Sequence, residues 1–329
     1  TLRPSSWKSI EQVGCNCFDV FKDINPIKGL PETVSLFYFK PLKMEGILKI
    51  AVQTKGRLNE DSLKLIEEVG IKLPLSTRKL ISTATNFPLE ALFLRDDDIP
   101  QAVAMGVADI GVVGENEMLE KKESVVIAKR LGFSKCRLSL AIPKDDIYQG
   151  VEYFNGKKIA TSYPEILRDF FKEKNITADI HVINGSVEIA PGIGLADAIF
   201  DIVSSGSTLV SNRLKEVEVV IKSEAVLIAN PNLSDEKKAI MDELIFRMES
   251  VQRAEKKKYI LLNAPNEKLA EIESYLPGMK SPTVMPLAEE GWSSVHSVIE
   301  ERDFWEIIGK LKAAGATGIL VIPIEKMIF

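Results

Sequence analysis

Residues 197–209 read Asp197-Ala198-Ile199-Phe200-Asp201-Ile202-Val203-Ser204-Ser205-Gly206-Ser207-Thr208-Leu209, which is an apolar strand, a loop of small hydroxyl residues and a helix start near Ser207. Backbone N–H groups at a helix start and Ser or Thr hydroxyls can together surround a phosphate. Gly206 lets the backbone come close to such a ligand, and Asp201 could accept hydrogen bonds from ribose hydroxyls. The alternative is an ordinary Ser/Gly turn with a helix cap. Because acid, strand, loop and helix follow in order, residues 196–214 predict a site for the phosphate of a phosphorylated ribose.

The chain around this motif alternates short apolar strands with amphipathic helices from Ile47 to about Asn230. The helix after the first strand is expected to have Asn59 as its N-cap, and Pro164 suits the first turn of a helix that extends to Lys174. The expected strands are 47–52, 92–94, 108–113, 138–142 and 158–161. Strands followed by helices of this length predict parallel sheets covered on both faces. The strands are numerous enough for two such sheets, and a two-lobed α/β body would place a ligand cleft between them.

The last part of the chain follows a different pattern. A long helix is expected from Asp235 to about Lys257, followed by segments in the order β-α-β-β-α-β. These segments are strand 259–263, helix 267–275, strands near 283–287 and 292–299, helix 303–314 and strand 317–322. The order predicts a ferredoxin-like domain. Such domains often bind a regulator or mediate assembly, but the fold alone establishes neither role.

The composition is that of a globular protein with two or three domains, because the 329 residues are 45% hydrophobic and 27% charged. A net charge of −5, from 42 basic and 47 acidic side chains, argues against a broad nucleic-acid surface. Three cysteines (Cys15, Cys17 and Cys136) with two histidines make neither a disulfide framework nor a zinc site, and free thiols are expected.

No segment approaches the roughly 20 apolar residues that span a bilayer, and the run 34–39 is too short for a signal-peptide core. We therefore expect a cytoplasmic protein with no membrane partner. Residues 1–43 lack regular periodicity and end just before Met44, which has the features of a natural start. They are treated as an unassigned N-terminal extension.

Basic residues follow the first strands of the predicted body. They are Lys55, Arg57, Arg78, Lys79 and Arg95. Ligands of open α/β sheets bind at the carboxyl ends of strands, where Lys55, Arg57 and Arg95 are expected. Guanidinium groups at such a position can pair with polyphosphate oxygens in a fork geometry. Each residue alone is as well explained by a solvated surface charge, and their shared position makes the two interpretations equal in weight.

Other polar clusters have structural explanations. The run Asp96-Asp97-Asp98 could be a metal cluster, but three consecutive side chains cannot all point at one ion. We favour Asp98 as the cap of the following helix, with the other two carboxylates near its positive end. His181 and His296 belong to no triad or metal pattern and are expected to be structural.

Further motifs lie in order along the chain. They are Gly56-Arg57-Leu58, Leu94-Arg95-Asp96-Asp97-Asp98-Ile99-Pro100, Gly114-Glu115-Asn116, Cys136-Arg137-Leu138-Ser139-Leu140-Ala141, Ala160-Thr161-Ser162-Tyr163-Pro164, Asn184-Gly185-Ser186-Val187-Glu188, Gly194-Leu195-Ala196-Asp197-Ala198-Ile199 and Ile322-Pro323-Ile324-Glu325-Lys326. With these motifs, the chain from Met44 to Phe329 resembles the long form of ATP phosphoribosyltransferase, the first enzyme of histidine biosynthesis.

The resemblance implies a catalytic body like the type II periplasmic binding proteins, with the chain crossing between lobes near Arg137 and Lys222. Lobe I would comprise 44–137 and 223–250, and lobe II would comprise 138–222. A histidine-binding regulatory domain would occupy 251–329, in agreement with the ferredoxin-like order found independently.

The reaction implied by the resemblance joins N1 of the ATP adenine to C1 of 5-phosphoribosyl 1-pyrophosphate and releases pyrophosphate. An adenine nitrogen already has a lone pair, so this glycosyl (pentosyl) transfer needs alignment and charge stabilisation more than a base. Mg²⁺ would arrive mainly with the substrate phosphates, and no protein metal site is expected.

The resemblance also implies residue roles. The 5-phosphate would lie on Ser204, Ser205, Gly206, Ser207, Thr208 and Leu209, with Asp201 on the ribose hydroxyls. Arg78 and Arg95 would help pyrophosphate to leave, with Arg57 as a further catalytic candidate. ATP and phosphates would contact Lys55, Arg57, Glu115 and Tyr163.

Feedback inhibition by L-histidine is implied as well, with a pocket at Asn263, Met279, Ser281, Thr283 and Gly318. Some relatives have Asp where this chain has Asn263, so we expect weaker inhibition here. A homo-oligomer is implied, from dimer to hexamer. Two alternatives remain: a solute receptor on the same two-lobed fold, which would usually carry a signal peptide, and a non-catalytic paralogue, which should have lost Arg57, Arg95 or the Asp201 loop.

Overall fold

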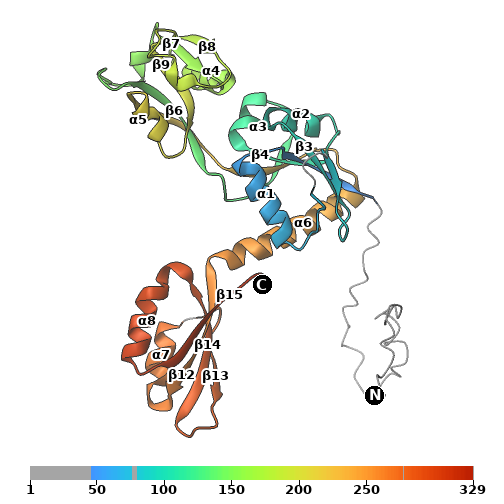
Figure 1. Ribbon diagram of the computed structural model, residues 1–329, viewed down its shortest axis with the longest axis vertical. Coiled ribbons are helices and arrows are strands. Elements are labelled where there is room, and N and C mark those ends of the chain that lie inside the picture. Colours follow the sequence, from blue (N-terminus) through green and yellow to red (C-terminus); the bar gives the residue numbers. More distant parts are fainter. Residues whose placement is uncertain (1–45, 76–79, 277, 329) are drawn as a thin grey trace, which may run out of the picture. The chain divides into compact units, whose positions relative to one another are not determined.

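The computed structural model describes residues 46–75, 80–276 and 278–328 (Figure 1). All described residues belong to the unit Met44–Phe329. The expectations for the N-terminal extension, for Cys15 and Cys17 and for Arg78 and Lys79 lie outside the described residues.

Lobe I is built on a six-stranded sheet with the strand order β2-β3-β1-β4-β11-β5. Alternate residues of β1 enter opposite faces, because Leu48, Ile50 and Val52 pack in one core cluster and Ala51 packs in another. Helices α1 and α6 contribute to the first cluster, and α2 contributes to the second. The strands are β1 Leu48–Gln53, β2 Ile81–Thr83, β3 Leu89–Leu94, β4 Ile110–Gly114, β5 Val126–Arg130 and β11 Ala225–Ala229; the helices are α1 Arg57–Glu68, α2 Ile99–Ala104, α3 Glu115–Lys121 and α6 Asp235–Glu255.

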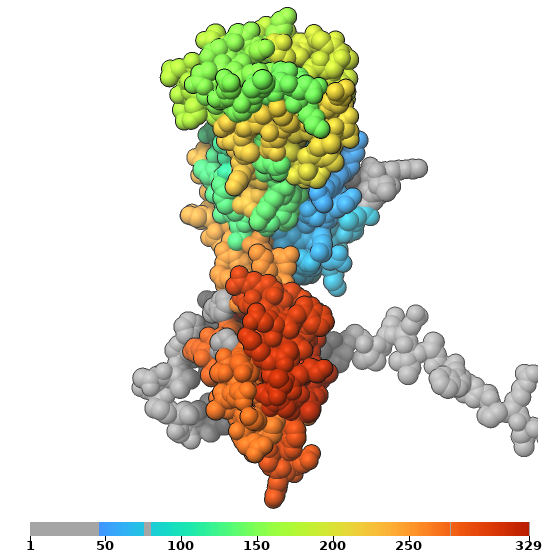
Figure 2. Space-filling model, turned by 90° about the vertical axis from the view of Figure 1, so that its left-hand side faces the viewer, coloured from blue at the N-terminus to red at the C-terminus, as the bar shows by residue number. Residues whose placement is uncertain are grey.

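Lobe II is built on a five-stranded sheet with the order β10-β6-β9-β7-β8. Its main core packs Leu138, Leu140 and Ile142 of one strand face against aromatic residues such as Phe154 and Phe171. Figure 2 shows green and yellow residues of this lobe meeting on one surface, as the pairing of β6 with β9 and β10 requires. The elements are β6 Cys136–Pro143, β7 Lys158–Thr161, α4 Pro164–Lys174, β8 Asp179–Val182, β9 Ala198–Val203, α5 Ser207–Ser211 and β10 Leu214–Ser223.

The chain passes between the two sheets twice, at 131–135 between β5 and β6 and at Glu224 between β10 and β11. This confirms the two-lobed α/β body with two crossings that the sequence resemblance implied. The domain limits drawn from the sequence stay predictions.

The expectation of parallel sheets was only partly right. β1 is parallel to β3 and β4, and β7 is parallel to β8 and β9. β11 is antiparallel to both β4 and β5, and β6 is antiparallel to β9 and β10. The cause is the second crossing: Ala225 at the start of β11 pairs with Gly114 at the end of β4, so the returning strand runs against its neighbour.

Two expected helix caps are also wrong. Helix α1 begins at Arg57 after Gly56, whose φ of 96° is left-handed, and Asn59 instead donates its side-chain amide to the Gln53 carbonyl. Asp98 precedes α2 but makes no side-chain cap. Its backbone is already helical because a short 3-10 turn, Asp96–Asp98, leads directly into α2.

The C-terminal domain has an antiparallel sheet of order β13-β14-β12-β15. Helices α7 and α8 pack on it through a core that includes Ile260, Ile272 and Leu311. Its elements are β12 Lys257–Pro265, α7 Leu269–Tyr275, β13 Thr283–Pro286, β14 Trp292–Glu300, α8 Phe304–Ala313 and β15 Thr317–Pro323. The predicted β-α-β-β-α-β order is confirmed. Among the described helices, none combines the length and apolar character needed to cross a membrane.

Candidate active site

Two parallel strands of lobe I end side by side and deliver basic residues to one sheet edge. β1 ends at Gln53, which is opposite Leu94 at the end of β3. The Thr54 N–H and hydroxyl both donate to the Leu94 carbonyl, at 2.8 and 2.7 Å, and so join the two departing segments. Lys55, Arg57 and Arg95 follow immediately and are exposed, and the described part of the chain gives none of them an ion-pair partner. The structure therefore brings these three cations to one edge.

The loop after β9 offers donors without local acceptors. Gly206 adopts a left-handed φ of 80°, and α5 begins at Ser207, as the sequence predicted. Among the described residues, no backbone acceptor faces the N–H groups of Ser204, Ser205 and Gly206. The Ser205 and Ser207 hydroxyls lie 3.0 Å apart. Because α5 has only five residues, these N–H and hydroxyl groups, more than a helix dipole, make the loop suited to an anion.

A cavity of about 260 Å³ adjoins this loop. Asp201 lines it and accepts a hydrogen bond from the Ile202 N–H at 2.7 Å. Burial raises the pKa of Asp201 to about 6, with a smaller contribution from the Glu188 carboxylate, and the Ile202 hydrogen bond opposes the rise. Burial destabilises the ionised form of this carboxylate, and hydrogen bonds from the hydroxyl groups of a ligand would stabilise it.

Tyr163 joins groups from both lobes. Its hydroxyl donates to the Glu117 carboxylate at 2.8 Å and accepts from the Asn116 amide at 3.3 Å. Burial, followed by the Glu117 carboxylate, raises the pKa of Tyr163, and smaller contributions come from Asp201 and Asp96. Burial likewise raises the pKa of Glu117. The Tyr163 side chain is only 7% exposed, so its expected contact with ATP remains a prediction.

Helix α3 of lobe I also caps helix α4 of lobe II. The Glu120 carboxylate accepts the N–H groups of Glu165 and Ile166, at 2.9 and 3.0 Å. Lys122 forms ion pairs with Glu165 and Asp169. Sequence reasoning missed Glu120, because its partners lie 45 and 46 residues away and no local pattern marks it.

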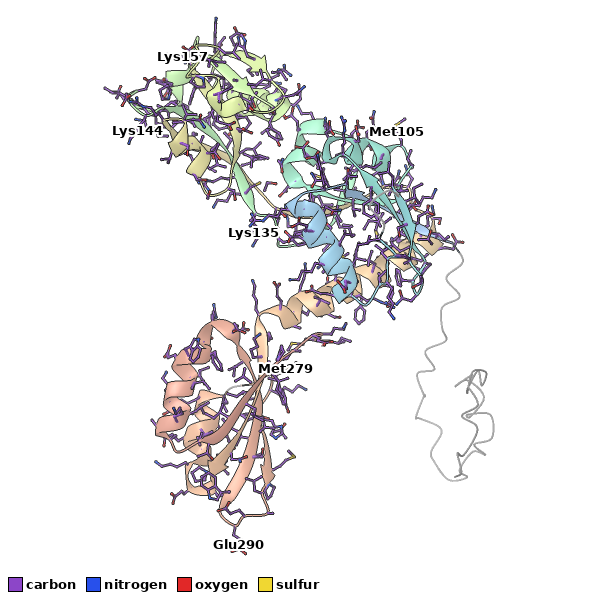
Figure 3. All side chains as sticks on the ribbon, in the orientation of Figure 1. Met105, Lys135, Lys144, Lys157, Met279 and Glu290 are labelled. Carbon is purple, nitrogen blue, oxygen red and sulfur yellow. The ribbon has the colours of Figure 1, made fainter. Side chains whose placement is uncertain are left out.

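A second cavity, of about 400 Å³, lies where the chain crosses between the lobes. Lys135, labelled in Figure 3, stands in the first crossing. Glu115 does not face this cavity as a free carboxylate, because both its oxygens accept from Arg130, at 2.5 and 2.6 Å. The lining residues are Glu115, Arg130, Lys135, Cys136, Arg137, Ser204, Lys222, Ser223 and Glu224.

Comparison with known proteins finds two matching families and several close relatives. Residues 95–250 match the family ATP phosphoribosyltransferase, and residues 254–326 match its partner family, described as HisG, C-terminal domain. The ATP phosphoribosyltransferase of Bacteroides thetaiotaomicron is 68% identical over 282 residues, which cover 86% of this chain and all of that protein. That of Cytophaga hutchinsonii is 62% identical over 285 residues, 87% of this chain and all of that protein.

The chain belongs to the ATP phosphoribosyltransferase family. Among solved structures, the ATP phosphoribosyl transferase (HisG:HisZ) complex from Thermotoga maritima matches with a TM-score of 0.55 and 27% identity, over 62% of this chain and 96% of that one. The HisG C-terminal domain match covers 254–326, which identifies the ferredoxin-like domain as the one that accompanies the long form of this family.

The residues expected to bind histidine in this member of the family lie in two groups. Asn263 on β12 is close to Gly318 on β15, where an added Cβ would come within 3.2 Å of the Asn263 amide nitrogen. Thr283 lies at the start of β13, paired with His296 of β14, and Ser281 and Met279 precede it. Met279 lines a cavity with Tyr259 of β12 and Ile322 of β15. The other four expected residues do not line that cavity. Met279 is labelled in Figure 3.

The two histidines have hydrogen-bond partners. His296 contacts the Tyr259 hydroxyl at 2.7 Å through Nδ1 and the Ser294 hydroxyl at 3.0 Å through Nε2. His181 lies 2.9 Å from the Asp179 carboxylate. Within residues 46–75, 80–276 and 278–328, no group of three or more His, Cys, Asp or Glu side chains is placed to hold a metal ion.

Proposed function

We propose that this chain joins N1 of the ATP adenine to C1 of 5-phosphoribosyl 1-pyrophosphate and releases pyrophosphate, the first step of histidine biosynthesis. The observation that carries the proposal is the loop 204–206, whose N–H groups lack a backbone acceptor beside the cavity lined by Asp201. Membership of the ATP phosphoribosyltransferase family supplies the reaction.

The 5-phosphate would bind the N–H groups and hydroxyls of Ser204–Leu209, which suit phosphate oxygens. Asp201 would accept the ribose hydroxyls, since its carboxylate lines the same cavity. Lys55, Arg57 and Arg95 would face the pyrophosphate, because they are exposed cations at one sheet edge. Arg78 stays a candidate from sequence alone.

The chemistry needs no general base. The adenine N1 lone pair attacks C1 of the ribose, the C1–O bond breaks, and the electron pair leaves with pyrophosphate. The protein aligns the two substrates and stabilises charge on the leaving group. We propose that Mg²⁺ arrives with the substrate phosphates, since hard divalent cations of this kind are usually held by phosphates and few carboxylates.

The decisive experiment incubates the pure protein with ATP, phosphoribosyl pyrophosphate and Mg²⁺, and follows phosphoribosyl-ATP by its absorbance and by mass. Product formation is expected. Substrate binding without product would favour the solute receptor, and histidine binding without product would favour the non-catalytic paralogue.

We further propose that the C-terminal domain binds L-histidine and that copies of the chain assemble through it. Assembly is supported by β15, an edge strand on which Leu320, Val321 and Ile322 are 55%, 36% and 46% exposed. An exposed apolar edge strand favours pairing with another chain. Sedimentation with and without histidine tests the assembly, and a monomer in both conditions would exclude it. The cytoplasmic location remains a prediction.

A further inference from the structure

Arg137, near the start of β6, donates one hydrogen bond from each nitrogen of its guanidinium group. Nε and Nη2 donate to the two carboxylate oxygens of Glu216 on β10, at 2.5 and 2.7 Å. Nη1 donates to the backbone carbonyl of Ser204 at 3.1 Å. Arg137 therefore connects the strand that enters lobe II, the strand that leaves it and the first residue of the phosphate loop.

Glu216 holds the guanidinium in one orientation. A two-point pair between Arg and a carboxylate has a fixed geometry as well as a favourable charge. The Ser139 hydroxyl donates to the same Glu216 oxygen that accepts from Nε, at 2.6 Å. Ser139 is in turn paired across the sheet with Asp201. The pKa of Glu216 is lowered, chiefly by the hydrogen bond from Arg137, so the carboxylate stays charged near neutrality.

The direction of the Ser204 carbonyl decides where the next N–H points. A trans peptide group is planar, and its C=O and N–H point to opposite sides. When Arg137 holds the Ser204 oxygen, the N–H of Ser205 is turned away from Arg137. No backbone acceptor within the described residues faces that N–H, and Ser205 and Gly206 line the loop cavity.

We propose that Arg137 is a positioning residue of the reaction: by holding the Ser204 carbonyl, it aims the Ser205 N–H at the 5-phosphate of phosphoribosyl pyrophosphate. This inference rests on the proposed function of the loop. Direct binding of phosphate by Arg137 is less favourable, because each of its three nitrogens already donates one hydrogen bond and Glu216 balances the charge. Arg137 therefore affects the ligand only by orienting the loop, and the backbone N–H of Ser205 contacts the phosphate.

The test compares Arg137→Met with the wild-type enzyme in steady-state kinetics and in calorimetric binding of ribose 5-phosphate. Loss of a charge-assisted hydrogen bond corresponds to about tenfold or more. We expect KM for phosphoribosyl pyrophosphate and Kd for ribose 5-phosphate to rise by this same factor, with KM for ATP changed less than about twofold. If KM for phosphoribosyl pyrophosphate and Kd for ribose 5-phosphate rise by the same factor, the effect lies at the 5-phosphate, which both ligands carry. A rise in KM for phosphoribosyl pyrophosphate with an unchanged Kd for ribose 5-phosphate would overturn the proposal.

A double variant separates positioning from charge. Arg137→Met leaves Glu216 unpaired near the loop, and its negative charge alone could repel phosphate. In Arg137→Met/Glu216→Gln that charge is absent. If the carbonyl contact matters, the double variant keeps the raised KM. Full recovery of the wild-type KM would show that Arg137 only neutralises Glu216 and would overturn the proposal.

Arg247→Met is the matched control. Arg247 pairs with Glu243 on α6, and its side chain is 34% exposed, close to the 32% of Arg137. This control is expected to leave both KM values unchanged. If Arg137→Met does not fold, Arg137→Lys keeps a charge but cannot hold both acceptors at once, so the same rise in KM is expected. A wild-type enzyme that forms no product would refute the proposed function itself, whatever the variants do.

Discussion

The two lobes present different kinds of groups that can bind phosphate. The edge of lobe I presents long cationic side chains, Lys55, Arg57 and Arg95, which are exposed and carry no described ion pair. The loop of lobe II presents backbone N–H groups and short hydroxyls, and the nearby cation Arg137 is already paired with Glu216. The difference matches the fates of the two phosphate groups. In the proposed reaction the 5-phosphate stays on the product and would bind the fixed backbone donors of the loop, whereas the departing pyrophosphate would bind the long cationic side chains.

The largest expected effect comes from the cationic side. Arg95→Ala should lower kcat by about 10²- to 10³-fold, the range found when one group that stabilises developing charge is removed. KM for phosphoribosyl pyrophosphate should change far less, because the 5-phosphate cradle is intact. Steady-state kinetics measure both, and histidine binding checks the fold.

Arg302→Ala is the matched control for Arg95→Ala, since Arg302 is an 83% exposed arginine of the C-terminal domain. Its kcat should equal that of the wild type. Unchanged turnover in Arg95→Ala would show that this residue is not part of the site. It would also contradict the proposal that the cations of lobe I bind pyrophosphate while the loop of lobe II binds the 5-phosphate.

The proposed role of the loop 204–209 in binding the 5-phosphate is tested by Gly206→Ala. An alanine Cβ would meet nothing closer than Val203 at 3.9 Å, so the cost is in the backbone, whose φ is +80°. A left-handed conformation costs a residue with a Cβ roughly 1–2 kcal/mol, and relief of that strain would move the loop donors. We expect KM for phosphoribosyl pyrophosphate to rise about tenfold with little change in kcat.

Gly70→Ala carries the same strain elsewhere. Gly70 follows α1, has a φ of +81° and has no atom within 4 Å of an added Cβ. It should lower the melting temperature as Gly206→Ala does while KM stays at the wild-type value. If both variants raise KM equally, general destabilisation explains the effect and the loop has no special role.

The acidic side of the loop gives a pH dependence. Asp201 has a folded-state pKa of about 6, raised from an ordinary value of 3.8. Ribose hydroxyls donate to the ionised carboxylate, so KM for phosphoribosyl pyrophosphate should rise as pH falls below about 6, approaching tenfold per pH unit. Asp201→Asn should show a raised KM without this slope, and a slope that persists in the variant would assign the titration to another group.

The same pKa has a consequence for stability, with a definite sign. Between pH 3.8 and about 6 the folded protein binds more protons at Asp201 than the unfolded chain does. The contribution of this group to the free energy of unfolding therefore falls as pH rises through that window. Urea titrations at pH 5 and 7 measure this contribution. The free energy of unfolding of the wild type, relative to that of Asp201→Asn, should be lower at pH 7 than at pH 5.

Sequence predicted the elements whose signals are local. The start of α5 at Ser207 follows Gly206, and α4 spans Pro164–Lys174 with proline in its first turn, as expected. The caps at Asn59 and Asp98 failed because the backbone before each helix had a conformation that residue type alone does not reveal. Mixed strand directions also escaped prediction, because they depend on where the chain re-enters each sheet.

Side-chain partners distant in sequence were beyond prediction for a related reason. Arg137 and Glu216 are 79 residues apart, and Tyr163 and Glu117 are 46 apart. Each residue taken singly reads as an ordinary charged or aromatic side chain. The pairing of β6 with β10, and the contact of α3 with α4, bring these distant partners within reach in the folded chain. The sequence motifs predicted which residues could bind the ligands. They did not predict the distant side chains that position those residues.

The smallest expected effect lies in the C-terminal domain. Asn263→Asp should strengthen histidine inhibition by about fivefold, because a carboxylate forms a charge-assisted hydrogen bond with the amino group of the ligand where the amide forms a neutral one. The inhibition constant measures this directly. Asn266→Asp is the control, since its side-chain oxygen accepts from Ser293 at 2.7 Å and a carboxylate keeps that bond. Equal inhibition constants for the wild type and Asn263→Asp would show that position 263 does not contact the amino group. Thr283, on the edge strand β13, and Ser281, just before it, would then be the candidates that recognise histidine.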